Sequence, residues 1–236
     1  DCFFISKLEV FDILLEKNRL IMKKQKPNVL QIKFMMRGIS PTVWRKLQIT
    51  EDSSFLDLHN VFQDSMGWSG RHLFEFRVNH PKEKELLLLS KIHNFGEDNP
   101  LAQDVLVKDI FTKKGQRGHY VYDLESNWLF EMKFEGAVPM RPRTQFPLCH
   151  SGSRFAPPED IGGIWSFEHY RDCLFDRQHE EHLIMLEHFY GGDFDMREYP
   201  TILAKAHESL TQCRIDVSLL KIRSREDAKV IVPAVQ

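Results

Sequence analysis

The sequence has few cysteines and no closely spaced pair of them. Cys2, Cys149, Cys173 and Cys213 are the four cysteines among 236 residues, and no Cys-x-x-Cys motif occurs. Such spacing does not support a disulfide scaffold and indicates reduced thiols in a reducing compartment. We therefore expect a cytoplasmic location.

Long apolar runs and targeting signals are also lacking. No stretch reaches the roughly eighteen apolar residues of a membrane-spanning helix. The first residues, Asp1-Cys2-Phe3-Phe4-Ile5, carry neither a basic region nor a small-residue cleavage site. We expect a soluble protein with no membrane partner. Met22, followed by two lysines, resembles a natural start, and we interpret residues 1–21 as an upstream extension.

Neither sign of charge is in excess. Lys and Arg together number 32 and Asp and Glu 34, which gives a net charge of −2. The clear basic excess of a dedicated nucleic-acid binder is therefore missing, although the count leaves open a local basic face. Nucleotide-binding Gly-x-Gly-x-x-Gly and Walker patterns and the Gly-x-Ser-x-Gly nucleophile motif are absent as well. We predict no cofactor.

Apolar residues are plentiful, with 18 Phe and 42% hydrophobic residues, enough for the core of one domain. Alternating apolar residues predict strands at 29–36, 43–49, 72–78, 85–90, 120–124 and 128–134, and a final strand at 215–222. Helical spacing predicts helices at 3–20, 55–66, 105–111, 167–175, 180–189 and 197–210. Residues 137–163 show no periodicity and are predicted to form a long structured loop.

This order of elements predicts an α+β fold. We expect a mainly antiparallel sheet built from hairpins, with helices packed on it and a helical C-terminal part. The single domain is predicted at residues 29–222. Residues 1–28 are predicted to form a helical extension and linker, and residues 223–236 a tail.

Several basic and aromatic side chains are candidates for binding. Arg45 and Trp44 point to opposite faces of their predicted strand, so Arg45 is either an anion-binding group or an ordinary surface arginine beside a core tryptophan. His59 borders the apolar stripe of its helix, where it is either a ligand or a hydrogen-bonded core histidine. His179 and His182 share a helix face, but His188 points elsewhere, so we predict no metal site there.

The segment 149–163 is the most distinctive feature. Pro157-Pro158 fixes an extended backbone, and Glu159 and Asp160 follow just before Gly162-Gly163. These carboxylates could bind a cation or carry out acid–base chemistry beside Cys149, His150 or Asp123. Alternatively, they cap loop amides or the helix that follows.

The landmarks of the chain, in order, resemble the plasmid pRiA4b ORF-3-like family. They are Trp44-Arg45, Leu58-His59, Gly67-Trp68, His72-x-Phe74-x-Phe76, Tyr122-Asp123, Trp128, Cys149-x-x-Gly152, Pro157-Pro158-Glu159-Asp160 and Gly162-Gly163. The resemblance spans residues 29–210 and implies an α+β fold without an established activity. It also implies an association with mobile genetic elements.

Two departures from the family pattern bear on chemistry. Members usually follow the Tyr-Asp pair with Phe-Gly-Asp, where this chain has Leu124-Glu125-Ser126. Many members flank the Pro-Pro-Glu-Asp segment with cysteines, where this chain has Ala156 and Ile161. A zinc cluster at this segment is therefore not expected, because Cys149 alone supplies a thiolate.

Three functions remain open. The first is a binding or accessory module of mobile elements with a protein or nucleic-acid partner, which predicts an exposed patch with Arg37, Arg45 and Arg71. The second is a hydrolase-like enzyme based on carboxylates and histidine, with or without a metal, and the third is a structural or dimerisation domain. The candidate site residues are Arg45, His59, Trp68, His72, Tyr122, Asp123, Trp128, Glu159 and Asp160.

Overall fold

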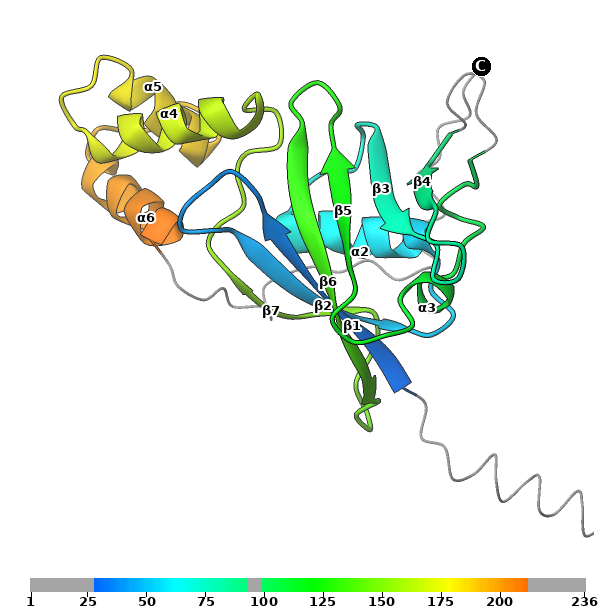
Figure 1. The fold of residues 1–236 in the computed structure, drawn as a ribbon. Coiled ribbons are helices and arrows are strands. Elements are labelled where there is room, and N and C mark those ends of the chain that lie inside the picture. Colours follow the sequence, from blue (N-terminus) through cyan, green and yellow to red (C-terminus); the bar gives the residue numbers. More distant parts are fainter. Residues whose placement is uncertain (1–27, 93–98, 212–236) are drawn as a thin grey trace, which may run out of the picture.

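A seven-stranded sheet forms the centre of the molecule (Figure 1). The computed structural model describes residues 28–92 and 99–211. The strands are β1 Asn28–Met36, β2 Trp44–Thr50, β3 Phe74–Asn79, β4 Leu86–Ser90, β5 Arg117–Tyr122, β6 Trp128–Pro139 and β7 Leu148–Ser153. Their order across the sheet is β4-β3-β5-β6-β1-β2-β7, and every neighbouring pair is antiparallel. The predicted α+β fold with an antiparallel sheet is confirmed.

Alternation along the strands separates a buried face from an open one. In β1, Leu30, Ile32, Phe34 and Met36 are buried, whereas the residues between them are partly exposed. The same period of two recurs in β6, β5 and β3, because successive side chains of a strand point to opposite faces. One face of the sheet therefore carries the core.

Helix α2, Phe55–Met66, covers this buried face and lies behind the sheet in Figure 1. Ser54 caps it, since its hydroxyl accepts the amide hydrogen of Asp57 while the Asp57 carboxylate accepts that of Ser54. Phe62 of the helix stacks on Phe34 of β1, with 4.3 Å between ring centroids. Such an aromatic pair adds about 0.5–1.5 kcal/mol beyond the area it buries.

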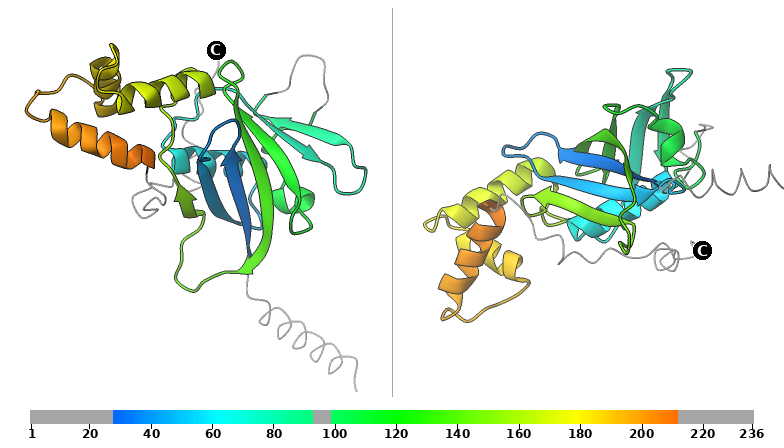
Figure 2. Two further views of the ribbon diagram at one scale, coloured as in Figure 1. Left: turned by 60° about the vertical axis from the view of Figure 1, so that its left-hand side comes forward. Right: turned by 90° about the horizontal axis from the view of Figure 1, so that it is seen from below.

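The C-terminal helices pack on one another beside the sheet, at the end away from β4 (Figure 2). They are α4 Gly163–Phe175, α5 His182–Tyr190 and α6 Tyr199–Thr211, and a short helix, α3 Val107–Ile110, precedes β5. Buried His182 joins all three, because its Nδ1 lies 2.7 Å from the carbonyl oxygen of Cys173 in α4 and its Nε2 lies 2.9 Å from the hydroxyl of Tyr199 in α6. None of the described helices has the length and apolar character needed to cross a bilayer.

Two predictions of local structure are wrong. Residues 137–163 are not one loop, because β6 continues to Pro139 and residues 148–153 form β7 on the edge of β2. Helix α5 begins at His182, so His179 lies in the turn before it and does not share a helix face with His182. The predicted helix at 3–20 and strand at 215–222 lie outside the described residues.

Candidate functional site

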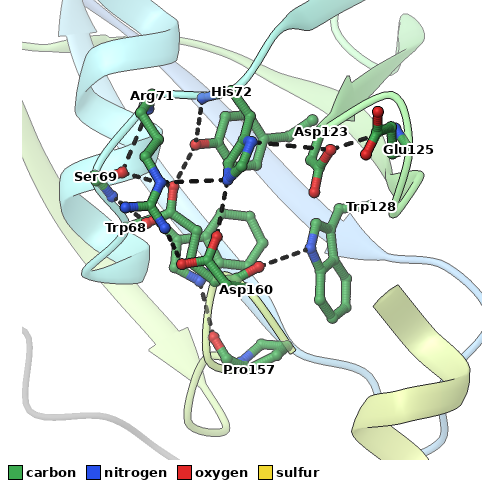
Figure 3. Close-up of polar contacts among 11 residues, drawn as sticks. Trp68, Ser69, Arg71, His72, Asp123, Glu125, Trp128, Pro157 and Asp160 are labelled. Atoms are coloured by element: carbon green, nitrogen blue, oxygen red, sulfur yellow. Dashed lines mark hydrogen bonds and ion pairs between the residues drawn. The ribbon is translucent and has the colours of Figure 1, made fainter. Parts of the chain in front are cut away.

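The chain after β7 runs as the acidic loop, residues 154–162, to the start of α4. Two tryptophans hold its backbone (Figure 3): the indole N–H of Trp68 donates to the carbonyl of Pro157 at 2.8 Å, and that of Trp128 donates to the carbonyl of Glu159 at 3.4 Å. Trp68 follows Gly67, whose left-handed conformation ends α2 and turns the chain toward the loop. The proline ring also restricts φ, so this part of the loop is held in one conformation.

Glu159 anchors the loop to the residues after α2. Its carboxylate accepts the backbone N–H of Ser69 at 2.7 Å, the Ser69 hydroxyl at 2.9 Å and the hydroxyl of buried Tyr122. Burial, followed by the hydrogen bond to Glu159, raises the pKa of Tyr122, so the phenol stays protonated as a donor. The Glu159 carboxylate is therefore occupied by three donors of the protein itself.

Asp160 pairs with two basic side chains on its outer side. One oxygen lies 2.9 Å from His72 Nε2, and the other accepts a hydrogen bond from the Arg71 guanidinium (Figure 3). The hydrogen bond from Arg71, and then that from His72, lower the pKa of Asp160. The side chain of Asp160 is half-exposed, so water screens both contacts.

His72 also faces a second carboxylate. Its Nδ1 lies 4.0 Å from Oδ1 of Asp123, a buried residue at the end of β5 whose same oxygen accepts the backbone N–H of Glu125 at 3.3 Å. The imidazole therefore lies between Asp123 on one side and Asp160 on the other (Figure 3). A carboxylate that orients an imidazole is an arrangement that acid–base catalysis uses.

The far end of the acidic loop abuts the turn between β5 and β6. In this turn Asp123 and Asn127 both have positive φ, and Asn127 N–H donates to the carbonyl of Asp123 at 2.6 Å. The turn thus forms without the glycine that the family pattern has there. A side-chain β-carbon at Gly163 would lie only 2.5 Å from the carbonyl oxygen of Ser126. Glycine is needed at this position by both the close approach and its φ of +90°.

The prediction that Arg45 lies at the surface beside a core Trp44 is wrong. Arg45 is only 3% exposed, whereas Trp44 lies partly exposed on the open face. The Arg45 guanidinium donates to the carbonyls of Ser65, Trp44, Ser153 and Arg154 at 2.9–3.2 Å. Burial lowers its pKa to about 10. Arg45 therefore holds the start of the acidic loop from inside and is not part of an exposed basic patch.

His59 is a core histidine. It is 3% exposed, its Nδ1 lies 2.7 Å from the Tyr120 hydroxyl, and its ring stacks on Phe74 with centroids 3.8 Å apart. Of the candidate residues, His59 lies in the core away from the acidic loop, and Arg45 contacts only the first residue of that loop, through the carbonyl of Arg154. The other seven meet at the acidic loop: Trp68, His72, Tyr122, Asp123, Trp128, Glu159 and Asp160.

Cys149 is unsuited to nucleophilic chemistry. The thiol is buried in β7, and burial raises its pKa to about 11. The nucleophile is the thiolate, which is scarce at neutral pH for such a group. Cys149 and Cys173, the two cysteines in the described part of the chain, are both free.

The open face of the sheet carries a cation row that sequence reasoning missed. Arg117 of β5 is paired in register with Lys133 of β6, Lys133 with Lys33 of β1, and Lys33 with Lys46 of β2. The predicted alternation identifies Lys33 and Lys133 as facing away from the core, whereas Arg117 lies outside the predicted strand 120–124 and Lys46 shares the face of Trp44, which the sequence predicts to be buried. Which residues of different strands are neighbours depends on register, and a single sequence does not reveal the register.

An open hollow of about 470 Å³ lies along the cation row. Its charged lining residues are Lys33, Arg37, Arg117, Lys133, Glu131 and Glu135. Glu131 pairs with Arg37 and Arg117, and Glu135 pairs with Lys46 at 2.8 Å. Lys33 Nζ lies 4.2 Å from the centre of the Trp44 ring. Four cations against two carboxylates leave the hollow basic.

Apolar side chains are exposed on the C-terminal helices. Trp165 of α4 is 86% exposed, and Ile184 of α5 is 60% exposed. A structural or dimerisation domain was expected to show such a surface, so the third alternative stays a prediction that sedimentation of the full chain tests.

The fold and the site together define a class of protein. It is an α+β domain with an antiparallel sheet, in which two tryptophans hold a Pro-Pro-Glu-Asp loop. The chain belongs to the family of plasmid pRiA4b ORF-3-like proteins, which it matches over residues 28–201. The predicted resemblance is thereby confirmed.

Two relatives show how far this similarity extends. The uncharacterized protein y4hQ of Sinorhizobium fredii (strain NBRC 101917 / NGR234) is 27% identical over 169 residues, which cover 71% of this chain and 84% of that protein. The crystal structure of MM3350, a protein of unknown function from Methanosarcina mazei Go1, is similar with a TM-score of 0.63 and 31% identity. That similarity covers 72% of this chain and 94% of MM3350. Family membership therefore brings the fold and no assigned activity.

Proposed function

We propose that the chain is a binding module associated with mobile genetic elements, and that its open sheet face binds the phosphate backbone of a nucleic acid. The cation row of Arg117, Lys133, Lys33 and Lys46 carries this proposal. With strands about 4.8 Å apart, the row extends over about 14 Å, which suits several successive phosphates.

The row has an energetic cost for the fold. Like charges directly opposite each other on neighbouring strands destabilise a sheet. Lys46 and Arg117 are compensated by Glu135 and Glu131, but Lys133 forms no ion pair with any described residue. An anionic partner would supply the missing counter-charge, which is why binding explains the row better than fold stability does.

Contacts at the acidic loop favour a structural role there. Three donors of the protein occupy the carboxylate of Glu159, and two basic side chains pair with Asp160. The loop thus fixes the end of the sheet and α4 relative to each other. We place binding on the sheet face and rigidity at the loop.

Fluorescence anisotropy with labelled single-stranded DNA, duplex DNA and RNA, at low and then rising salt, tests the proposal. We expect log affinity to fall with log salt with a slope of up to roughly −3, the value for four phosphate contacts to a single strand. The double variant Lys33→Glu, Lys133→Glu is expected to bind at least about tenfold more weakly.

The matched control is Lys108→Glu, Lys205→Glu, which makes the same change of charge at exposed residues of α3 and α6. It should bind nearly as the unaltered chain does. The proposal is wrong if no nucleic acid is retained at low salt, or if both double variants lose affinity equally. Retention on an acidic protein alone would assign the face to a protein partner.

Acid–base catalysis at His72 is a second candidate, favoured by the position of this imidazole between Asp123 and Asp160. His72→Asn should then abolish turnover in a panel of ester and phosphate-ester substrates, while the Lys33, Lys133 double variant retains it. A panel without turnover by the unaltered chain removes this candidate.

We further propose that the module comprises residues 29–222 and resides in the reducing cytoplasm. The family match at residues 28–201 and the two free thiols support this. The proposed extension at 1–28 and tail at 223–236 lie almost wholly outside the described residues.

A further inference from the structure

A cluster of metal-ligating side chains lies away from the acidic loop and the cation row, where α4 turns toward α5. We name it the His-Cys-Glu cluster, and it consists of His169, Cys173, His179 and Glu181. His169 and Cys173 are four residues apart in α4 and so lie on one face of the helix. His179 and Glu181 come from the turn between the helices, where His179 N–H donates to the carbonyl of Asp176 at 3.1 Å.

The four donor atoms converge within 4.8 Å of one another. Cys173 Sγ lies 3.5 Å from His169 Nε2, 3.8 Å from His179 Nε2 and 3.8 Å from a carboxylate oxygen of Glu181. Tetrahedral zinc, with bonds of about 2.3 Å to sulfur and 2.0–2.1 Å to nitrogen, holds these two atoms roughly 3.6 Å apart. The sulfur is therefore already at the spacing that such an ion requires.

We propose that the His-Cys-Glu cluster binds a divalent transition-metal ion, with zinc the ion that its donors suit best. Two imidazoles, a thiolate and a carboxylate are ligands of Zn²⁺ and similar ions, whereas Ca²⁺ and Mg²⁺ prefer oxygen alone. Four protein ligands close the coordination shell, which is typical of a structural site. The ion would tie α4 to the turn that leads into α5.

Binding requires modest local changes. His169 Nε2 and the Glu181 carboxylate, now 2.5 Å apart, would separate to admit the ion. His179 Nδ1 accepts the backbone N–H of Glu181 at 3.1 Å, so ligation through Nε2 moves the ring proton to Nδ1 and ends this hydrogen bond. The thiol releases its proton on binding. The metal–ligand bonds replace the contacts that are lost.

Sequence reasoning predicts no metal site here because it places His179, His182 and His188 on one helix, where His188 points away from the other two. Since α5 begins only at His182, His179 turns toward Cys173 while His182 turns into the core. Cys173 itself is fully buried, whereas His169 is exposed, so the site would sit at the surface with its sulfur inside. An ion can therefore enter from solvent.

Cobalt titration of the full-length, reduced, untagged chain after chelator treatment tests the proposal. We expect a thiolate-to-cobalt charge-transfer band and the intense visible bands of a tetrahedral ion, saturating at one equivalent and displaced by zinc. Zinc should also raise the melting temperature, because an ion that binds only the folded state stabilises it.

Two variants probe the ligands. Cys173→Ala should lose the charge-transfer band, and His169→Gln should weaken cobalt binding at least about tenfold, since loss of even an outer-shell partner commonly costs that much. His169 is exposed, so its variant is expected to fold even if Cys173→Ala does not.

His119→Gln, at an exposed residue of β5, is the matched histidine control and should leave the titration unchanged. So should Cys2→Ala and Cys213→Ala, whose cysteines lie outside the described residues. The proposal is overturned if the unaltered chain gives no tetrahedral cobalt spectrum, or if His169→Gln binds cobalt as tightly as the unaltered chain.

Discussion

At the scale of single residues, the alternation of β2 is predicted correctly, but its two faces are exchanged. The sequence suggests that Trp44 faces the core and Arg45 the solvent. The two side chains do point to opposite sides of β2, but the arginine is the buried one. Hydrophobicity predicts the reverse. The carbonyls of Ser65, Ser153 and Arg154 lie far from Arg45 in sequence, and only the fold brings these acceptors to it.

We predict that Arg45→Met lowers the free energy of unfolding by about 3 kcal/mol, because it leaves several buried carbonyls without their donor. Urea unfolding measures the change. Arg77→Met, at an exposed residue of β3, should change the stability by less than about 0.5 kcal/mol. Similar losses in both variants would contradict the structural role assigned to Arg45.

Asp160 gives the chain a pH-dependent contact. The hydrogen bond from Arg71, and then that from His72, lower its pKa in the folded state, so its contribution to stability is present above the unfolded value of about 3.9. That contribution is lost as the pH falls through the lower folded value. We predict that Asp160→Asn destabilises the chain at pH 7 and that the difference from the unaltered chain shrinks below about pH 4.

Urea unfolding of both proteins between pH 7 and pH 3 measures this difference. The control is Asp195→Asn. Asp195 lies outside the acidic loop, and hydrogen bonds from Arg197 lower its pKa as well, so this variant shows the effect of removing such a carboxylate elsewhere in the chain. Tryptophan fluorescence follows the unfolding, and Trp68 and Trp128 at the acidic loop contribute to it together with Trp44 and Trp165. A gap between unaltered chain and Asp160→Asn that widens on acidification would contradict the assignment.

At the scale of elements, most strands and helices follow from the sequence. The apolar alternation of β1 and β6 and the capping residues of α2 are local signals, and a single sequence shows them. Strand β7 was not predicted because its sequence, Leu-Cys-His-Ser-Gly-Ser, is mostly polar and has no apolar alternation. It lies at the edge of the sheet, where its pairing with β2 defines it as a strand. The candidate residues can be named from their motifs, but their meeting at the acidic loop depends on the fold, just as the cation row depends on register.

Gly163 is the point where two elements come closest. We predict that Gly163→Ala destabilises the chain more than Gly191→Ala. Both glycines have a φ near +90°, but nothing lies within 4 Å of a β-carbon at Gly191, whereas the carbonyl oxygen of Ser126 lies 2.5 Å from one at Gly163. Gly191→Ala should cost about 1–2 kcal/mol for its backbone conformation, and Gly163→Ala about 1–3 kcal/mol more for the steric overlap.

Thermal and urea unfolding of the two glycine variants provide the comparison. Because the backbone conformation is matched, the difference between them isolates the contact of α4 with the β5–β6 turn. If both variants lose the same free energy of unfolding, the backbone near Ser126 moves away from the added methyl group at no energetic cost.

At the scale of the whole molecule, the charge is unevenly distributed. The chain as a whole carries a net charge of −2, yet the open face of its sheet presents a continuous row of cations across β5, β6, β1 and β2. The net charge of the chain therefore does not indicate the charge of the partner that this face would bind. A local row of like charges matters for association because the field close to it is set by the nearest groups.

We predict that Lys133→Gln stabilises the fold and weakens nucleic-acid binding together. Lys133 lies directly opposite both Lys33 and Arg117, so its removal relieves repulsion and should raise the free energy of unfolding by about 0.2–1 kcal/mol. It also removes a phosphate contact, which should reduce the steepness of the salt dependence by about 0.7. Lys108→Gln, at an exposed residue of α3, should change neither quantity. If Lys133→Gln instead destabilises the fold, then Lys133 stabilises the folded chain. The presence of the cation row would then need no binding partner to explain it.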